Sequence, residues 1–281
     1  MTNEQEKQLR QLACRVRMGI LEGTHAAKSG HPGGSLSAAD VLTWLYFREM
    51  KVDPARPDWE ERDRFVLSKG HCAPGLYAAL ALRGFFPVEE LKTLRAIGSR
   101  LQGHPNRCMT PGVDMSTGSL GQGVSTACGM ALGAKHRGMP NRVYTLLGDG
   151  EIQEGQVWEA FLFAAHYKLD NLCVIIDNNG LQIDGRIADV MSPYPIDEKM
   201  RAFGFEVVCI DGNSFPELET AFAKARATKG KPTCILMHTV KGKGVSFMED
   251  QVGWHGKAPN DEQYAQGMAE LTAALKKWEA D

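Results

Sequence analysis

Two short polar loops carry residue types that bind a hard metal ion. Gly148-Asp149-Gly150 follows the apolar run 143–147, and Asn178-Asn179 follow the apolar run 172–176. Asp149 and Asn179 offer a carboxylate and an amide oxygen, which suit Mg²⁺ or Ca²⁺ better than zinc. Because Mg²⁺ keeps few protein ligands and takes others from phosphates, the pair indicates a diphosphate ligand, with the Gly150 N–H close to it. Each loop alone is also typical of an ordinary turn.

The segment between the two loops predicts how they come together. Residues 156–167 are helix-like, and Asp170-Asn171 form a turn before the second apolar run. A strand, a helix and a second strand in this order form a right-handed crossover between parallel strands. Ligands of such open sheets gather at the carboxyl ends of the strands. We therefore expect Asp149 and Asn179 to meet at one edge of a parallel sheet.

The remaining sequence predicts an α/β fold with a doubly wound, mainly parallel sheet flanked by helices. Further apolar runs of strand length occur at 64–68, 206–210 and 233–238. No repeat or linker interrupts the chain, so residues 1–281 are expected to form a single domain. Helices are expected over the opening segment, where Leu9, Leu12, Val16 and Ile20 recur at steps of three and four, and near 261–278.

A second helix is expected after the loop Gly30-His31-Pro32-Gly33-Gly34. Ser35 or Ser37 could cap its first turn, because both hydroxyls can accept a backbone N–H. Its inward face would carry Leu36, Ala39, Leu42 and Trp44.

Composition excludes several classes of protein. The chain has 281 residues, 43% of them hydrophobic and 23% charged, with a net charge of −2, so broad nucleic-acid binding through basic charge is disfavoured. No run approaches the ~18–20 apolar residues that a membrane span needs. The seven cysteines include no C-x-x-C pair, which argues against a disulfide framework or a zinc knuckle. These features favour a cytoplasmic protein that binds neither nucleic acid nor membrane.

Four of the eight histidines lie in loops rich in glycine or proline: His31, His71, His104 and His255. Loops at one sheet edge can converge, and imidazole, with an unperturbed pKa of ~6.5, suits proton transfer near neutral pH. Any one of them alone would be read as a surface or capping residue. Their spacing is not that of a zinc site.

Other phosphate-binding motifs are absent. Gly148-Asp149-Gly150 is followed by Glu151-Ile152-Gln153 without the third glycine of a dinucleotide-binding loop, and there is no G-x-x-x-x-G-K-[ST] sequence. Lys241-Gly242-Lys243-Gly244 in isolation is typical of a solvated basic turn.

In combination, the motifs resemble those of thiamine-diphosphate enzymes, in which GDG is followed about thirty residues later by NN. The resemblance is specifically to the amino-terminal, diphosphate-binding part of transketolase, and it covers almost the whole chain. The motifs in family order are Ser29-Gly30-His31-Pro32-Gly33, Ser68-Lys69-Gly70-His71, Gly103-His104-Pro105, 117–123, Gly148-Asp149-Gly150-Glu151 with Glu154-Gly155, 241–244 and Trp254-His255-Gly256.

This resemblance implies a role for each matching residue. Asp149, Asn179 and the backbone carbonyl of Leu181 would hold Mg²⁺, for which Ca²⁺ or Mn²⁺ could substitute. His31 and His255 would transfer protons, and His104 would bind the hydroxyl end of the donor ketose. The expected cofactor contacts are His71, Gly118, Ser119, Leu120, Gly150, Glu154, Asn179, Lys241 and His255, with Glu159 close to the cofactor or to a subunit interface.

The resemblance also implies what this half lacks. The glutamate that activates the cofactor belongs to a pyrimidine-binding domain, which in ordinary transketolases follows on the same chain, whereas here only a short segment follows His255. We therefore expect the amino-terminal subunit of a split transketolase. A separately encoded carboxyl-terminal partner would complete it as an α2β2 heterotetramer, which transfers a glycolaldehyde unit from a ketose phosphate to an aldose phosphate.

Two alternatives remain open at this point. The chain could belong to another thiamine-diphosphate enzyme, such as one resembling 1-deoxyxylulose-phosphate synthase or a 2-oxo acid dehydrogenase, although His31, His104 and Trp254-His255-Gly256 favour ketose transfer. It could also be a non-catalytic cofactor-binding relative. Pentose phosphates are the expected substrates, with a specialised sugar such as a branched pentulose phosphate as a further option.

Overall fold

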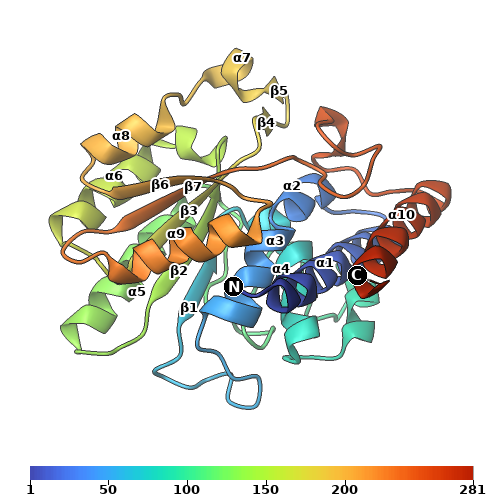
Figure 1. Ribbon diagram of the computed structural model, residues 1–281, viewed down its shortest axis with the longest axis horizontal. Coiled ribbons are helices and arrows are strands. Elements are labelled where there is room, and N and C mark those ends of the chain that lie inside the picture. The colour runs from blue at the N-terminus through green and yellow to red at the C-terminus, as the bar shows by residue number, and fades with distance from the viewer. Residues whose placement is uncertain (281) are drawn as a thin grey trace.

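A five-stranded parallel sheet forms the centre of the computed structural model, which describes residues 1–280 (Figure 1). The predicted parallel α/β sheet is confirmed, and the apolar runs differ from the strands by one or two residues at most. In spatial order the strands are β1 (Arg64–Leu67), β2 (Val143–Gly148), β3 (Leu172–Asn178), β7 (Thr233–His238) and β6 (Glu206–Asp211).

Helices cover both faces of this sheet, and each face has its own hydrophobic cluster. Alternate residues of β2 point to opposite faces, so Tyr144 and Leu146 join one cluster while Val143 and Leu147 join the other. Helices on the first face are α1 (Asn3–Ala27), α2 (Pro32–Ser37), α3 (Ala39–Trp44), α4 (Ala73–Arg83) and α9 (Phe215–Ala227). Helices on the second face are α5 (Gln122–His136), α6 (Gly155–His166) and α8 (Ile196–Ala202).

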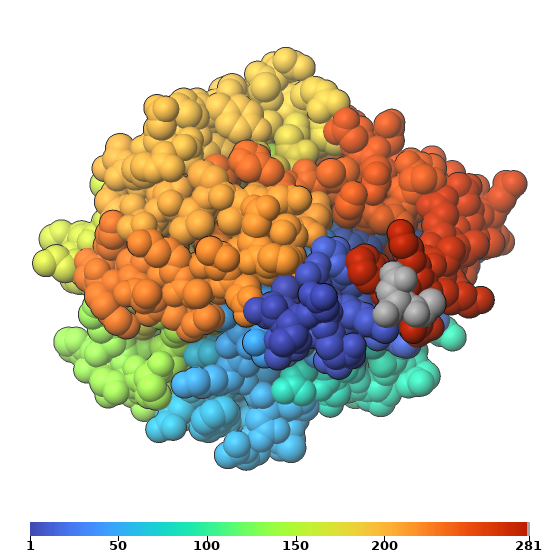
Figure 2. Space-filling view, in the orientation of Figure 1, coloured from blue at the N-terminus to red at the C-terminus, as the bar shows by residue number. Residues whose placement is uncertain are grey.

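The first and last long helices pack together at the surface. Figure 2 shows α10 (Asp261–Ala280) beside the amino-terminal helix α1. Helix α1 begins with a capping box in which Thr2 accepts the N–H of Gln5 and the Gln5 side chain accepts the N–H of Thr2. Both helices lie where the sequence predicts them. No helix within residues 1–280 combines the length and the apolar character that crossing a membrane requires.

The predicted second helix is partly wrong. Its inward residues Leu36, Ala39, Leu42 and Trp44 are buried as expected. However, the segment divides into α2 and α3, and α2 begins at Pro32, whose fixed φ suits the first helical position. The two serines do not cap it: Ser35 Oγ donates to the His31 carbonyl, and Ser37 Oγ donates to the carboxylate of Asp177.

A short segment between β3 and α8, here called the excursion, leaves the sheet at its carboxyl edge. It contains a two-stranded antiparallel hairpin of β4 (Leu181–Gln182) and β5 (Gly185–Arg186), followed by α7 (Ile187–Met191). In Figure 1 this hairpin lies above the edge where β2, β3 and β7 end. The excursion therefore brings its backbone over the loop that follows β2.

Candidate active site at the carboxyl edge of the sheet

The loops after β2 and β3 meet, as the crossover predicts. Gly148 is in register with Asp177, and the Asp149 N–H donates to the Asp177 carbonyl over 3.2 Å. One carboxylate oxygen of Asp149 accepts the N–H of Gly180 over 2.7 Å. The side chain from the first loop thus bonds directly to the backbone of the second.

The three expected metal ligands line one cavity. Asp149 is 2% exposed, and burial, followed by the nearby charge of Asp177, raises the pKa of its carboxyl to about 7. The Asn179 amide oxygen accepts the Leu181 N–H, and the Leu181 carbonyl accepts the Lys241 ammonium over 3.3 Å. Within residues 1–280 no group of three His, Cys, Asp or Glu is arranged to hold a metal. A cation here would therefore use the amide and carbonyl oxygens besides Asp149.

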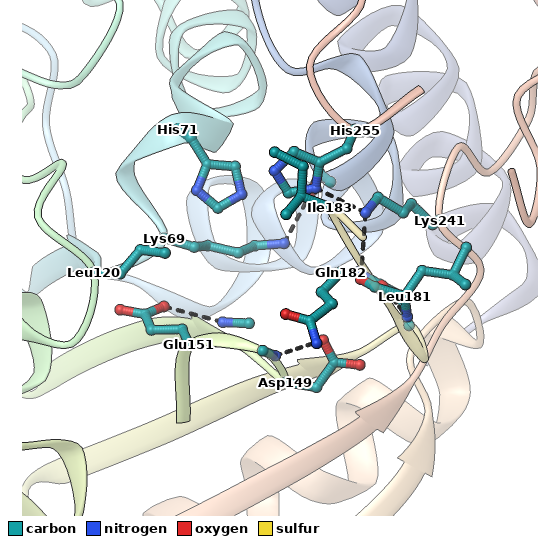
Figure 3. Close-up of a pocket in the computed structure, with 14 residues that line it drawn as sticks. Lys69, His71, Leu120, Asp149, Glu151, Leu181, Gln182, Ile183, Lys241 and His255 are labelled. Atoms are coloured by element: carbon teal, nitrogen blue, oxygen red, sulfur yellow. Dashed lines mark hydrogen bonds between the residues drawn. The ribbon is translucent and has the colours of Figure 1, made fainter. Parts of the chain in front are cut away.

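The cavity has a volume of about 230 Å³ (Figure 3). Its walls combine the loop after β2, the hairpin β4–β5, the segment after β7 and the turn before α4. The lining residues are Gly34, Lys69, His71, Leu120, Gly148, Asp149, Gly150, Glu151, Asn179, Leu181, Gln182, Ile183, Lys241 and His255.

Lys241 is a buried cation and not part of a solvated turn. Its side chain is almost fully enclosed, and its ammonium lies 2.9 Å from Nδ1 of His255. Burial lowers the pKa of Lys241 to about 8, so the side chain is still largely protonated at pH 7. A buried positive charge beside backbone N–H groups is suited to a phosphate oxygen.

Three of the four loop histidines form a triangle above the cavity. The ring centroid of His31 lies 5.1 Å from that of His71 and 5.5 Å from that of His255, and the last two are 5.3 Å apart. Burial, assisted by neighbouring positive charge, lowers the pKa of His31 and His71 to about 4 and that of His255 to about 3. Near pH 7 the rings are therefore neutral, and each can donate one proton and accept another.

The donor set fits a diphosphate bound with a divalent cation. Nε2 of Gln182, a cavity-lining donor, is buried without a hydrogen-bond partner, and so is Nδ1 of His31, which lies outside the lining residues. Gly150 lies beside the Gln182 side chain, where an added Cβ would be in ordinary contact, 3.4 Å from Gln182 Cβ. Unpaired buried donors are costly and call for an acceptor. N–H, imidazole and ammonium groups thus face the cavity beside the oxygens of Asp149, Asn179 and Leu181.

Several predicted residues lie outside the cavity wall. Gly118 and Ser119 line a smaller neighbouring hollow of about 110 Å³. The ring of His104 packs against Gly118, where an added Cβ would lie 3.0 Å from the imidazole. Glu154 is exposed at the start of α6, packed against Gly121. Glu159 is likewise exposed, on α6.

The sequence analysis assigned no role to a buried ion pair at the cavity, formed by the lining residue Lys69 and by Asp177 behind it. Lys69, 2% exposed, forms an ion pair with Asp177, which is fully buried. Burial alone would lower the pKa of Lys69, but Asp177 reverses the effect and raises it. Asp177 also accepts the hydroxyls of Ser37 and Thr239. Three further lining residues also received no role from the sequence: Glu151, Gln182 and Ile183. The one signal that could have indicated them is that each lies within three positions in the sequence of a predicted site residue.

The family follows from comparison with known proteins. Residues 9–277 match the model of the family described as "Transketolase, thiamine diphosphate binding domain". The chain belongs to the transketolase family and corresponds to the domain that binds thiamine diphosphate.

Several relatives resemble this chain along nearly their whole length. The 6-deoxy-6-sulfo-D-fructose transketolase subunit SqwG of Clostridium sp. (strain MSTE9) is 47% identical over 269 residues, covering 96% of this chain and 98% of that protein. An apulose-4-phosphate transketolase subunit of Phocaeicola vulgatus is 42% identical, covering 94% of each.

A solved transketolase supports the same fold. The structure of transketolase from Leishmania mexicana matches with a TM-score of 0.88 and 32% identity, covering 97% of this chain. This chain spans only 45% of the length of that protein.

Proposed function

We propose that this chain is the amino-terminal subunit of a two-chain transketolase. It would use thiamine diphosphate and Mg²⁺, or Ca²⁺ or Mn²⁺ in its place, to transfer a two-carbon glycolaldehyde unit from a ketose phosphate to an aldose phosphate. One observation carries the proposal: a carboxylate, an amide oxygen, a backbone carbonyl, a buried lysine and two imidazoles line a single cavity at the sheet edge. The related transketolase subunits support it.

The polar residues of the cavity would hold the diphosphate and its cation. Asp149, Asn179 and the Leu181 carbonyl would bind the cation, and Lys241, His71 and the Gly150 N–H would meet phosphate oxygens. Thiamine diphosphate, when bound, supplies the nucleophilic carbon that carries the two-carbon unit. Leu120, Gly118 and Ser119 would border its rings, and Glu154 would lie nearer the partner.

The histidines would move and position protons. His31 and His255 are neutral near pH 7, so each can accept a hydrogen bond from a substrate hydroxyl, the contact through which its proton would be taken up and returned. Their ring centroids lie 5.5 Å apart, which allows both to reach one substrate. His104, packed against Gly118, would bind the hydroxyl end of the donor ketose.

The cavity also argues for a partner. Its volume of about 230 Å³ is below the ~300–1,000 Å³ of pockets that enclose a whole ligand, so this chain would hold only part of the cofactor. Leu120 and Ile183 at the cavity are 39% and 62% exposed. Exposed apolar side chains beside a site favour a covering surface. We infer a separately encoded pyrimidine-binding subunit in an α2β2 assembly.

Residues 1–281 would form one cofactor-binding domain of a cytoplasmic enzyme. Within residues 1–280, one five-stranded sheet with a hydrophobic cluster on each face supports this organisation. For the substrate, pentose phosphates are the starting assumption. Two relatives are named for 6-deoxy-6-sulfo-D-fructose and apulose-4-phosphate, so specialised ketoses should be assayed alongside the pentose phosphates.

The test is purification of the tagged chain from its native extract with thiamine diphosphate and Mg²⁺, followed by sizing, mass spectrometry and transfer assays. A stoichiometric pyrimidine-domain subunit, and two-carbon transfer that disappears when this subunit is withheld, are expected. Full transfer activity from the isolated chain would contradict the two-chain proposal. Decarboxylation of a 2-oxo acid without ketose transfer would contradict the assigned reaction.

A further inference from the structure

Glu151 is a buried carboxylate that binds three separate loops. It lies directly after Gly150 and is 3% exposed. Oε1 accepts the N–H of Gly121 over 3.0 Å and the hydroxyl of Ser68, and Oε2 accepts the N–H of Gly148 over 3.1 Å. Both carboxylate oxygens are therefore used, by donors far apart in the sequence.

Each of these three segments contributes to the candidate active site. Ser68 immediately precedes Lys69 and lies three positions before His71, both of which line the cavity. Gly121 ends the segment that contains Leu120, and Gly148 precedes Asp149. The Glu151 carboxylate thus links three segments that each contribute lining residues to the cavity.

Glu151 forms no ion pair with a basic side chain anywhere in residues 1–280. Its two carboxyl oxygens are instead held by three hydrogen bonds, from the N–H groups of Gly121 and Gly148 and from the Ser68 hydroxyl. A glutamine would retain one oxygen, but its NH₂ group would face an N–H, so at least one loop would lose its anchor. The site therefore depends on having two acceptor oxygens at this position.

We propose that Glu151 is a positioning residue that holds the turn before α4, the segment before α5 and the loop after β2 in the arrangement that binds the cofactor. The inference rests on the proposed function of this site. Glu151 itself need not touch the cofactor, because it acts through the backbone of Gly148 and Gly121 and through Ser68.

Asp63 provides a matched control at the other end of the sheet. It is 4% exposed, and its carboxylate accepts the N–H of Lys51 and the N–H of Arg142, both over 2.8 Å. It therefore also joins loops through a buried carboxylate, but none of those loops lines the cavity. Asp63→Asn should lower stability without changing the affinity for the cofactor.

The experiment titrates thiamine diphosphate with saturating Mg²⁺ into the full chain, with its co-purifying partner, by calorimetry. We expect Glu151→Gln to weaken binding at least ~10-fold, as the loss of a hydrogen bond to a buried N–H implies. Asp63→Asn should bind within about twofold of wild type, and both variants should melt at lower temperature. Ser68→Ala, which removes only one donor, should weaken binding by about two- to fivefold.

The outcomes separate this inference from the proposed function. Failure of the wild-type protein to bind thiamine diphosphate contradicts the proposed function itself. Normal wild-type binding combined with unchanged affinity in Glu151→Gln overturns the role of Glu151, as does an equal loss in Asp63→Asn. If Glu151→Gln does not fold, Ser68→Ala decides: an affinity equal to that of wild type overturns the inference.

Discussion

The ion pair of Lys69 with Asp177 should make a large contribution to stability. Lys69 is 2% exposed and Asp177 fully buried, so neither charge can return to water when its partner is removed. Lys69→Met would leave the carboxylate with the hydroxyls of Ser37 and Thr239 as its main donors. Breaking a buried pair costs ~3–5 kcal/mol, and because both hydroxyls and the more distant Asn179 amide still donate to Asp177 we expect the lower end, about 3 kcal/mol.

The assay is urea unfolding at pH 7, without cofactor, so that ligand binding does not contribute to the apparent stability. Lys69→Met and Asp177→Asn should each lower the free energy of unfolding. The double variant should cost about 1–3 kcal/mol less than the sum of the single variants, because it leaves no unpaired charge. Lys135→Met is the exposed control: its pair with Asp170 is 39% and 25% exposed and should contribute only ~0–1 kcal/mol.

Two results would refute this reasoning. One is a cost below ~1 kcal/mol for Lys69→Met, equal to that of the exposed control. The other is additivity, with the double variant costing the full sum of its parts, which would mean that the two charges do not stabilise each other.

Three further predictions concern the site. Asp149→Ala should weaken thiamine diphosphate binding by at least ~10–100-fold and abolish its dependence on Mg²⁺, measured by calorimetry with and without the metal; retained metal dependence would contradict the ligand assignment. His31→Ala and His255→Ala should lower turnover by ~10²–10⁴ at saturating cofactor and affect cofactor affinity less; wild-type turnover in either would remove its assigned role. Because burial lowers the pKa of His31 to about 4, that of His71 to about 4 and that of His255 to about 3, the unfolded chain binds protons below pH ~6.5 that the folded chain does not. Stability should therefore fall as the pH decreases from ~6.5 toward ~4 in urea titrations, and His31→Asn should make that fall shallower; an unchanged pH dependence in the variant would contradict the assignment.

The strands and the meeting of two loops were predictable because they depend on local patterns. Buried parallel strands read as apolar runs, and the strand–helix–strand sequence places Asp149 and Asn179 at one edge whatever the rest of the fold does. The spatial order was not predictable in the same way. Strand β7 lies between β3 and β6 although β6 precedes it in sequence. No local sequence pattern specifies this reversed order of β6 and β7.

The errors and omissions involve contacts between distant residues. Ser37 was expected to cap a helix, but its hydroxyl is taken by Asp177, 140 positions away. Lys69 lies in the motif Ser68-Lys69-Gly70-His71, yet its buried ion pair is with Asp177 near the end of β3. Glu151 joins loops that only the folded sheet brings together. Local sequence gives no direct information about such partners, because their donors come from other strands and loops.

The most direct test of the central claim is anomalous diffraction from crystals of the chain with its partner, thiamine diphosphate and Mn²⁺. The account predicts one Mn²⁺ peak at the carboxyl edge of the sheet, coordinated by the Asp149 carboxylate, the Asn179 amide oxygen and the Leu181 carbonyl. Diphosphate oxygens should complete its ligands, beside Lys241 and His71. A Mn²⁺ peak elsewhere, or cofactor bound at this edge without the ion, would contradict it.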